Sequence, residues 1–284
     1  MSSDADALTL EVDGLHVAAQ CWGEPDAAPV LALHGWLDNS ASFCRLAPRL
    51  QGVRVVALDM AGHGQTAHRP GSAPYNIWED VAEVMAVVDQ LGWTSFSLLG
   101  HSRGAIVSSL VAAAFPERID RLALIEGIFP EPVASVDAPH QLRNSIIESR
   151  KLANKPLRLF SDLEAAVKAR INGMFPLSDR AARALTERGV QPVDGGYRWS
   201  TDQRLLAPSS FKFTRGQIDG FIRAIESPTR VILAEEGMPK LYPGYKEAVQ
   251  GYSHLELFEL PGGHHLHLED QVDDVAKLVN EFFT

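Results

Sequence analysis

The stretch FSLLGHSRG, residues 96–104, decides the fold of this chain. It opens on an apolar run, matches the pattern G-x-S-x-G at residues 100–104, and leads directly into an apolar helical pattern over residues 105–115. A serine between such a strand and helix lies in a strained turn, and the flanking glycines let neighbouring backbone approach it closely. The following helix N-terminus favours developing negative charge. We therefore predict that Ser102 is a nucleophile.

Similar apolar runs recur on both sides of this stretch, and they suit parallel strands covered on both faces. They lie at residues 30–33, 53–58, 122–125, 231–234 and 255–260. Helical patterns at residues 76–91 and 272–283 alternate with them, and a hairpin pattern joins residues 8–12 to 15–22. The alternation predicts an α/β fold with a mostly parallel, doubly wound sheet.

Between residues 129 and 227 the alternation breaks and helical signals replace it. Ser161 can cap a helix over 162–171, and Ser178 can cap another that runs to Arg188. The sheet pattern resumes after this insertion, so a separate domain is disfavoured. We predict a core of residues 1–128 and 228–284, with residues 129–227 forming a mostly helical lid over the carboxyl ends of the strands.

Composition narrows the class of protein. The chain has 284 residues, 45% hydrophobic and 22% charged, with a formal net charge of −10 and no basic cluster, which argues against nucleic-acid binding. No apolar run is long enough to span a membrane, and the acidic start, residues 1–6, lacks the features of a signal peptide. We expect a cytoplasmic protein without membrane or nucleic-acid partners, either a monomer or a homodimer. The two cysteines suggest neither a disulfide nor a zinc site.

A histidine-rich segment near the C-terminus, GGHHLHLE at residues 262–269, offers a general base. The two glycines suit a tight loop after the strand at 255–260, which places His264 at the carboxyl edge of the sheet. His264 and His267 also have a spacing that metal sites use, but no further ligand cluster stands out. We therefore predict His264 as the base, with no metal and no cofactor.

These motifs together resemble those of the α/β-hydrolases. The residues that carry the resemblance are HGW at 34–36, LD at 58–59 followed by GHG at 62–64, GHSRG at 100–104 and GHHLHLE at 263–269. The run HGWLDN at 34–39, with the histidine-rich ending, is similar to the serine hydrolase-like protein subgroup. The resemblance implies that the backbone N–H groups of Trp36 and Arg103 form the oxyanion hole. It also implies that His264 is the base.

The family's catalytic triad consists of a nucleophile, a histidine and an acid, and the acid is where this sequence departs from the family pattern. Where most members carry an aspartate after the strand at 231–234, this chain has Gly237. Glu126, at the end of the strand at 122–125, is one replacement, and related haloalkane dehalogenases include members whose acid lies there. Glu235 or Glu236 is the other candidate, if the loop after the strand at 231–234 is slightly shifted. We favour Glu126, because Gly127 leaves room for its loop.

A serine nucleophile disfavours the aspartate-based chemistry of dehalogenases and epoxide hydrolases. It predicts a carboxylesterase-like serine hydrolase that cleaves an ester, thioester or amide of a small, largely apolar substrate through an acyl-enzyme. The alternatives are a cofactor-free lyase or oxygenase on the same fold and a non-catalytic ligand-binding receptor.

Substrate contacts are expected mainly from the lid. The candidates are Phe129, Met174 and Phe175, for which packing within the lid is the alternative, and His34 beside the oxyanion loop. Arg103 is unusual next to a nucleophile. It either recognises a substrate carboxylate or pairs with a lid acid such as Glu131, and we favour the pairing.

Overall fold

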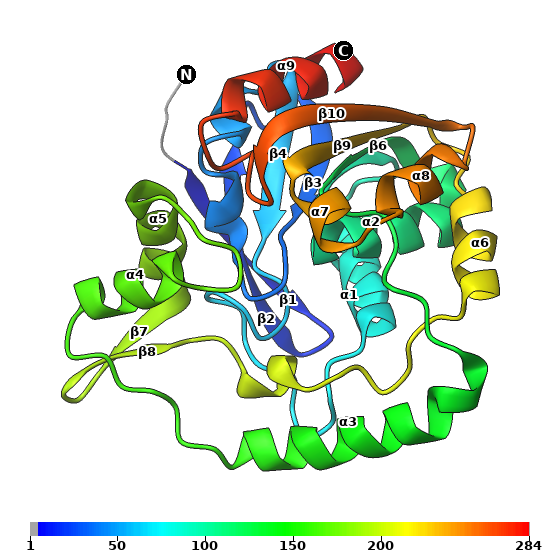
Figure 1. Ribbon diagram of the computed structural model, residues 1–284. Coiled ribbons are helices and arrows are strands. Elements are labelled where there is room, and N and C mark those ends of the chain that lie inside the picture. Colours follow the sequence, from blue (N-terminus) through cyan, green and yellow to red (C-terminus); the bar gives the residue numbers. More distant parts are fainter. Residues whose placement is uncertain (1–4, 284) are drawn as a thin grey trace.

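The computed structural model describes residues 5–283, and its centre is an eight-stranded sheet (Figure 1). The strands are β1 (Asp6–Val12), β2 (Leu15–Trp22), β3 (Ala28–Leu33), β4 (Val53–Leu58), β5 (Phe96–His101), β6 (Ile119–Ile125), β9 (Thr229–Glu236) and β10 (Leu255–Gly263). Their order is β1-β2-β4-β3-β5-β6-β9-β10, and only the pairings of β2 with β1 and β4 are antiparallel. The predicted α/β-hydrolase fold is confirmed. Residues 1–4, on which the expectation about the N-terminus rests, and residue 284 lie outside the described residues.

Both faces of the sheet are buried, which explains why its strands are continuous apolar runs. In β3, Leu31 and Leu33 belong to one core cluster, whereas Val30 and Ala32 belong to another on the opposite face. This alternation is the two-residue period of a strand. Helices α1 (Ile77–Gln90), α2 (Arg103–Ala114), α6 (Arg215–Arg223) and α8 (Tyr245–Gln250) cover the first face, and α9 (Val272–Phe283) covers the second (Figure 1).

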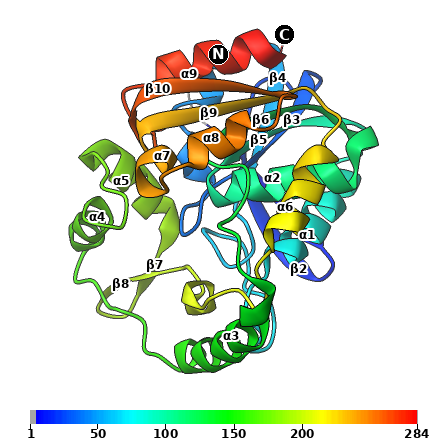
Figure 2. The ribbon, with the colours of Figure 1, turned by 45° about the vertical axis from the view of Figure 1, so that its right-hand side comes forward.

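The segment between β6 and β9 contains most of the remaining elements. They are α3 (Ala138–Ala153), α4 (Leu163–Ile171), α5 (Asp179–Gly189) and the hairpin of β7 (Val190–Val193) with β8 (Gly196–Trp199). In Figures 1 and 2, α4 and α5 lie to the left of the sheet and α3 lies beneath it. Asp162, rather than Ser161, caps α4 by accepting a hydrogen bond from the backbone N–H of Ala165. Ser178 caps α5 as predicted. Among the described residues, no helix has the length and apolarity needed to cross a membrane.

The division into core and lid at residues 129 and 227 stays a prediction. The α6 helix lies inside the expected lid range, yet its residues Ile218 and Ile222 pack in the same apolar cluster as Val107 and Val111 of α2. By contrast, α4 and α5 supply most of a small third cluster, which also contains Leu268 from the loop after β10. The segment therefore has an α4–α5 part, which packs on that loop, and an α6 part that joins the main core.

Two buried ion pairs attach the α4–α5 part to the core. Arg170 of α4 binds Asp38, whose side chain is 1% exposed. Arg188 of α5 donates from Nε to both carboxylate oxygens of Asp59, each at 3.0 Å. Asp59 also accepts hydrogen bonds from the backbone N–H groups of Ser40 and Gln65. The motif LD at 58–59 therefore serves as an attachment point for the α4–α5 part.

We expect the substitution Arg188→Met to lower the free energy of unfolding by about 3 kcal/mol, because it leaves the buried Asp59 carboxylate without its cation. Arg183→Met is the matched control on the same helix. Arg183 pairs with Glu164, whose side chain is 66% exposed, and the loss of such a surface pair costs less than about 1 kcal/mol. Urea unfolding measures both values, and equal effects of the two substitutions would contradict the assignment.

Candidate active site

The site lies at the point of the sheet where the strand order changes direction along the chain. From β3 the chain proceeds to β4 on one side, whereas β5 and β6 follow on the other, so the reversal lies between β3 and β5. The loops after parallel strands meet at this point, and ligand sites of open α/β sheets form there. The loops after β3, β5, β6, β9 and β10 carry the residues described below.

Ser102 stands in a tight turn between β5 and α2. Its backbone has a φ of 52° and a ψ of −116°, a conformation that L-residues rarely adopt. The N–H of Ser102 donates to the carbonyl of Ile125 at 2.8 Å. A Cβ atom at Gly104 would lie 2.0 Å from the carbonyl oxygen of Leu33, so only glycine allows this approach of α2 to β3. Such strain is typical of functional positions.

Three side chains form a continuous hydrogen-bonded series. The hydroxyl of Ser102 lies 2.9 Å from Nε2 of His264, and Nδ1 of His264 lies 2.9 Å from Oε2 of Glu126. Because a carboxylate only accepts, Nδ1 carries the proton, and Nε2 is left to accept the hydroxyl proton of Ser102. The structure thus brings together the three residues that the sequence proposed as nucleophile, base and acid.

The position of Glu126 explains the departure at Gly237. Oε1 accepts a hydrogen bond from the N–H of Ala234 at 2.6 Å, and Oε2 accepts one from Met238 at 2.8 Å. A Cβ atom at Gly237 would lie only 2.0 Å from Oε2. The carboxylate of Glu126 therefore fills the space that a side chain at 237 would need.

No hydrogen bond or ion pair joins His264 to Glu235 or Glu236, the alternative acids, within residues 5–283. Both side chains are exposed, and Glu236 forms an ion pair with Lys240, four residues further along the chain. Among the described residues, Glu126 is the carboxylate that binds the imidazole of His264.

Burial controls the protonation of this series. It lowers the pKa of His264 to about 3 and raises the pKa of Glu126 to about 7. The N–H groups of Ala234 and Met238 act on Glu126 in the opposite direction. A neutral imidazole is therefore favoured in the resting site, which is the form that a general base requires.

The expected oxyanion donors lie beside the nucleophile. Trp36 and Arg103 line the same cavity as Ser102, and their backbone N–H groups have no hydrogen-bond partner among residues 5–283. The side chain of Arg103 pairs with Asp80 of α1 at 2.5 Å, and not with Glu131 as expected. The reason is that α1 packs against α2 and brings a buried carboxylate closer than the lid does.

A cavity of about 1330 Å³ opens above Ser102 and His264. Phe129, Met174 and Phe175 are among its lining residues, and their contact with a substrate stays a prediction. The ring of Phe175 stacks on the imidazole of His264, with centroids 4.0 Å apart and planes at 23°.

His34 differs from its predicted role, because it does not line this cavity. It is 1% exposed, its Nδ1 donates to the carbonyl of Gly35, and its Nε2 accepts from the N–H of Met60. The Nδ1 contact lies within the loop after β3, and the Nε2 contact joins that loop to the loop after β4.

Sequence reasoning missed a group of residues behind the oxyanion loop. Asp38, Arg170 and His265 line the cavity, and Arg170 and His265 each bind the carboxylate of Asp38. Asp38 belongs to the HGWLDN run, but the run alone does not reveal its partners, which come from α4 and from the loop after β10.

Comparisons with known proteins agree with this fold and site. The family model for the alpha/beta hydrolase fold matches residues 28–271. The serine hydrolase-like protein of Danio rerio is 30% identical and covers 99% of this chain and 89% of its own length. Serine hydrolase-like protein 2 of Homo sapiens is also 30% identical and covers 97% of this chain and 93% of its own.

Solved structures give the same picture. A hypothetical protein from Pseudomonas aeruginosa PAO1 is 45% identical, with a TM-score of 0.91 and coverage of 99% of this chain and 98% of its own. The thioesterase domain from the curacin biosynthetic pathway is 26% identical, with a TM-score of 0.83 and coverage of 97% and 99%.

The chain belongs to the α/β-hydrolase family. Within that family it is similar to the serine hydrolase-like proteins over nearly its whole length, as the motifs at 34–39 and 263–269 predicted.

Proposed function

We propose that this α/β-hydrolase is a serine esterase that hydrolyses a carboxylic ester or thioester, or an amide, through an acyl-enzyme. The observation that carries the proposal is the series Ser102–His264–Glu126, with 2.9 Å at both contacts. Ser102 attacks the carbonyl carbon while Nε2 of His264 takes its proton, and the same imidazole then protonates the leaving group. Water releases the acid in a second, equivalent step.

The surroundings of Ser102 support charge stabilisation in this reaction. The N–H groups of Trp36 and Arg103 are the proposed donors to the tetrahedral oxyanion, and such donors each contribute on the order of a hundredfold or more in rate. Because Asp80 pairs with the guanidinium of Arg103, we assign that side chain a structural role and not recognition of a substrate carboxylate.

The cavity supports a largely apolar acyl group. Several large apolar side chains that line it are also exposed to solvent: Trp36, Met174, Leu206, Leu241 and Tyr242. The volume of about 1330 Å³ exceeds the roughly 300–1,000 Å³ common for small ligands. We propose a small-molecule substrate with an extended acyl chain. The similarity to a thioesterase domain supports a thioester as one option.

We expect kcat/KM to be at least about tenfold higher for p-nitrophenyl octanoate than for p-nitrophenyl acetate. Burying a CH₂ group contributes about 0.8 kcal/mol, so two such groups in the cavity suffice for this ratio. A series from acetate to palmitate measures it, with Ser102→Ala correcting for spontaneous hydrolysis. The highest rate on acetate would contradict an extended acyl pocket.

Failure of the folded protein to turn over any ester would instead favour the two alternatives. A lyase or oxygenase would use the His264–Glu126 pair without an acyl-serine, and a receptor would bind a small molecule in the cavity without turnover.

A further inference from the structure

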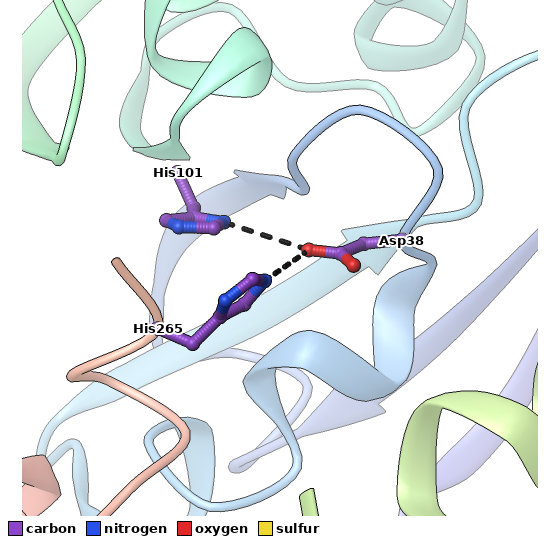
Figure 3. Close-up of side chains that lie close together, drawn as sticks. All are labelled: Asp38, His101 and His265. Carbon is purple, nitrogen blue, oxygen red and sulfur yellow. Dashed lines mark hydrogen bonds and ion pairs between the residues drawn. The ribbon is translucent and has the colours of Figure 1, made fainter. Parts of the chain in front are cut away.

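Three buried side chains face one another behind the oxyanion loop (Figure 3). Asp38 follows β3, His101 ends β5 and His265 follows β10, and none is more than 4% exposed. Oδ2 of Asp38 lies 3.0 Å from Nε2 of His265 and 3.8 Å from Nδ1 of His101. All three ligand atoms lie within 4.8 Å of one another.

Hydrogen bonding fixes the protonation of His101. Its Nε2 lies 2.9 Å from the carbonyl oxygen of His264, and because a carbonyl only accepts, Nε2 carries the proton. With that proton on Nε2, the other ring nitrogen of the neutral imidazole, Nδ1, presents a lone pair. Among the described residues Nδ1 has no hydrogen-bond partner. A lone pair thus faces the Asp38 carboxylate, an arrangement that a cation between them would stabilise.

Two imidazoles and one carboxylate are a donor set that zinc uses, with metal–ligand distances of about 2.0–2.2 Å. Tetrahedral ligands at that distance are separated by about 3.3–3.6 Å. The two separations from Asp38, 3.0 Å and 3.8 Å, differ from that spacing by a few tenths of an ångström. The two imidazole nitrogens lie within 4.8 Å of each other, so metal binding also requires His101 and His265 to move closer together. In this structure Nε2 of His265 donates to Oδ2 of Asp38, so a metal ion has to replace that hydrogen bond.

The surrounding contacts have the character of an outer ligand shell. Metal-binding histidines usually donate their second N–H to a carbonyl or carboxylate, as His101 does to His264. The guanidinium of Arg170 binds Oδ1 of Asp38 and leaves Oδ2 turned to the histidines. Asp38, His101 and His265 all line the main cavity, which provides an entry path for an ion.

We propose that Oδ2 of Asp38, Nδ1 of His101 and Nε2 of His265 form a binding site for a divalent transition-metal ion of the zinc type. The site lies next to the reacting groups, since His101 precedes Ser102, His265 follows His264 and Asp38 is two residues from Trp36. An ion there ties together the three loops that carry nucleophile, base and oxyanion donor.

The test is a titration of the intact, chelator-treated protein with Zn²⁺ by calorimetry and with Co²⁺ by visible absorption, without any ester substrate. We expect one equivalent of each ion to bind, with the intense d–d bands of four- or five-coordinate Co²⁺. Asp38→Asn and His265→Gln should each weaken binding at least about tenfold, because outer-shell changes alone already cost 10–100-fold. Thermal melts without metal establish that both variants are folded.

His140→Ala is the matched control, since His140 is an exposed histidine on α3 far from these loops in sequence. It should retain the one-equivalent site. Absence of stoichiometric binding to the folded parent protein would show that the three side chains are only a hydrogen-bonded network. Binding that survives in Asp38→Asn and His265→Gln would likewise overturn the proposal. Neither outcome depends on esterase activity, so the proposed function is tested separately.

Discussion

Replacing Ser102 by alanine is expected to lower kcat/KM for p-nitrophenyl octanoate by about 10⁴-fold or more, a loss of about 5.4 kcal/mol or more in transition-state stabilisation. The hydroxyl is the group that forms the acyl bond, and His264, at 2.9 Å, has no other nucleophile in hydrogen-bond contact among the described residues. Steady-state kinetics of the purified variant measure the effect.

Ser109→Ala is the matched control for this substitution. Ser109 lies on the same α2 helix, is buried, and donates to the carbonyl of Ala105 at 3.1 Å. It should retain kcat/KM within about threefold, because an internal helix hydrogen bond is worth only about 1 kcal/mol or less. Substantial turnover by Ser102→Ala would instead show that the His264–Glu126 pair activates water directly.

Glu126→Gln should lower kcat/KM by about 10³–10⁴-fold, comparable with the loss of the triad carboxylate in other serine hydrolases. The two carboxylate oxygens accept from Ala234, Met238 and His264 together. A glutamine supplies one acceptor and one donor. In one orientation its NH₂ meets the N–H of Ala234, and in the other it meets Met238 and stabilises the wrong tautomer of His264.

The pH profile separates this role from a purely structural one. Glu126 stabilises the imidazolium of His264, so its removal should move the acidic limb of kcat/KM to lower pH. Glu235→Gln and Glu236→Gln serve as controls and should change kcat/KM by less than about twofold, since both side chains are exposed. A larger loss in either control than in Glu126→Gln would contradict the assignment.

The core elements could be predicted because local pattern and burial agree there. The apolar runs at 53–58 and 122–125 lie in β4 and β6, and the pattern at 272–283 coincides with α9. The helix α3 gave no such signal, because only Ser145 and Ser149 are buried along it. A helix that buries so little apolar surface against the core lacks the helical spacing of apolar residues on which prediction depends.

The site was predictable where chemistry depends on strand ends, and not where it depends on packing between distant segments. Ser102, Glu126 and His264 each follow a strand directly, and the carboxyl ends of parallel strands meet at the same edge of the sheet. The predicted partner of Arg103, a lid acid such as Glu131, was wrong, because the pairing with Asp80 depends on how α1 packs against α2. His34 was assigned to the substrate because its position after β3 does not reveal that both ring nitrogens bind backbone.

Reaction with a fluorophosphonate probe tests the central claim most directly, because the probe reports an activated serine without knowledge of the natural substrate. We predict one phosphonyl group per folded chain by intact-protein mass spectrometry, located on Ser102 by peptide mapping. Labelling should vanish in Ser102→Ala and persist in Ser109→Ala. A folded protein that takes up no probe, or takes it up equally in Ser102→Ala, would contradict a nucleophilic serine at this turn.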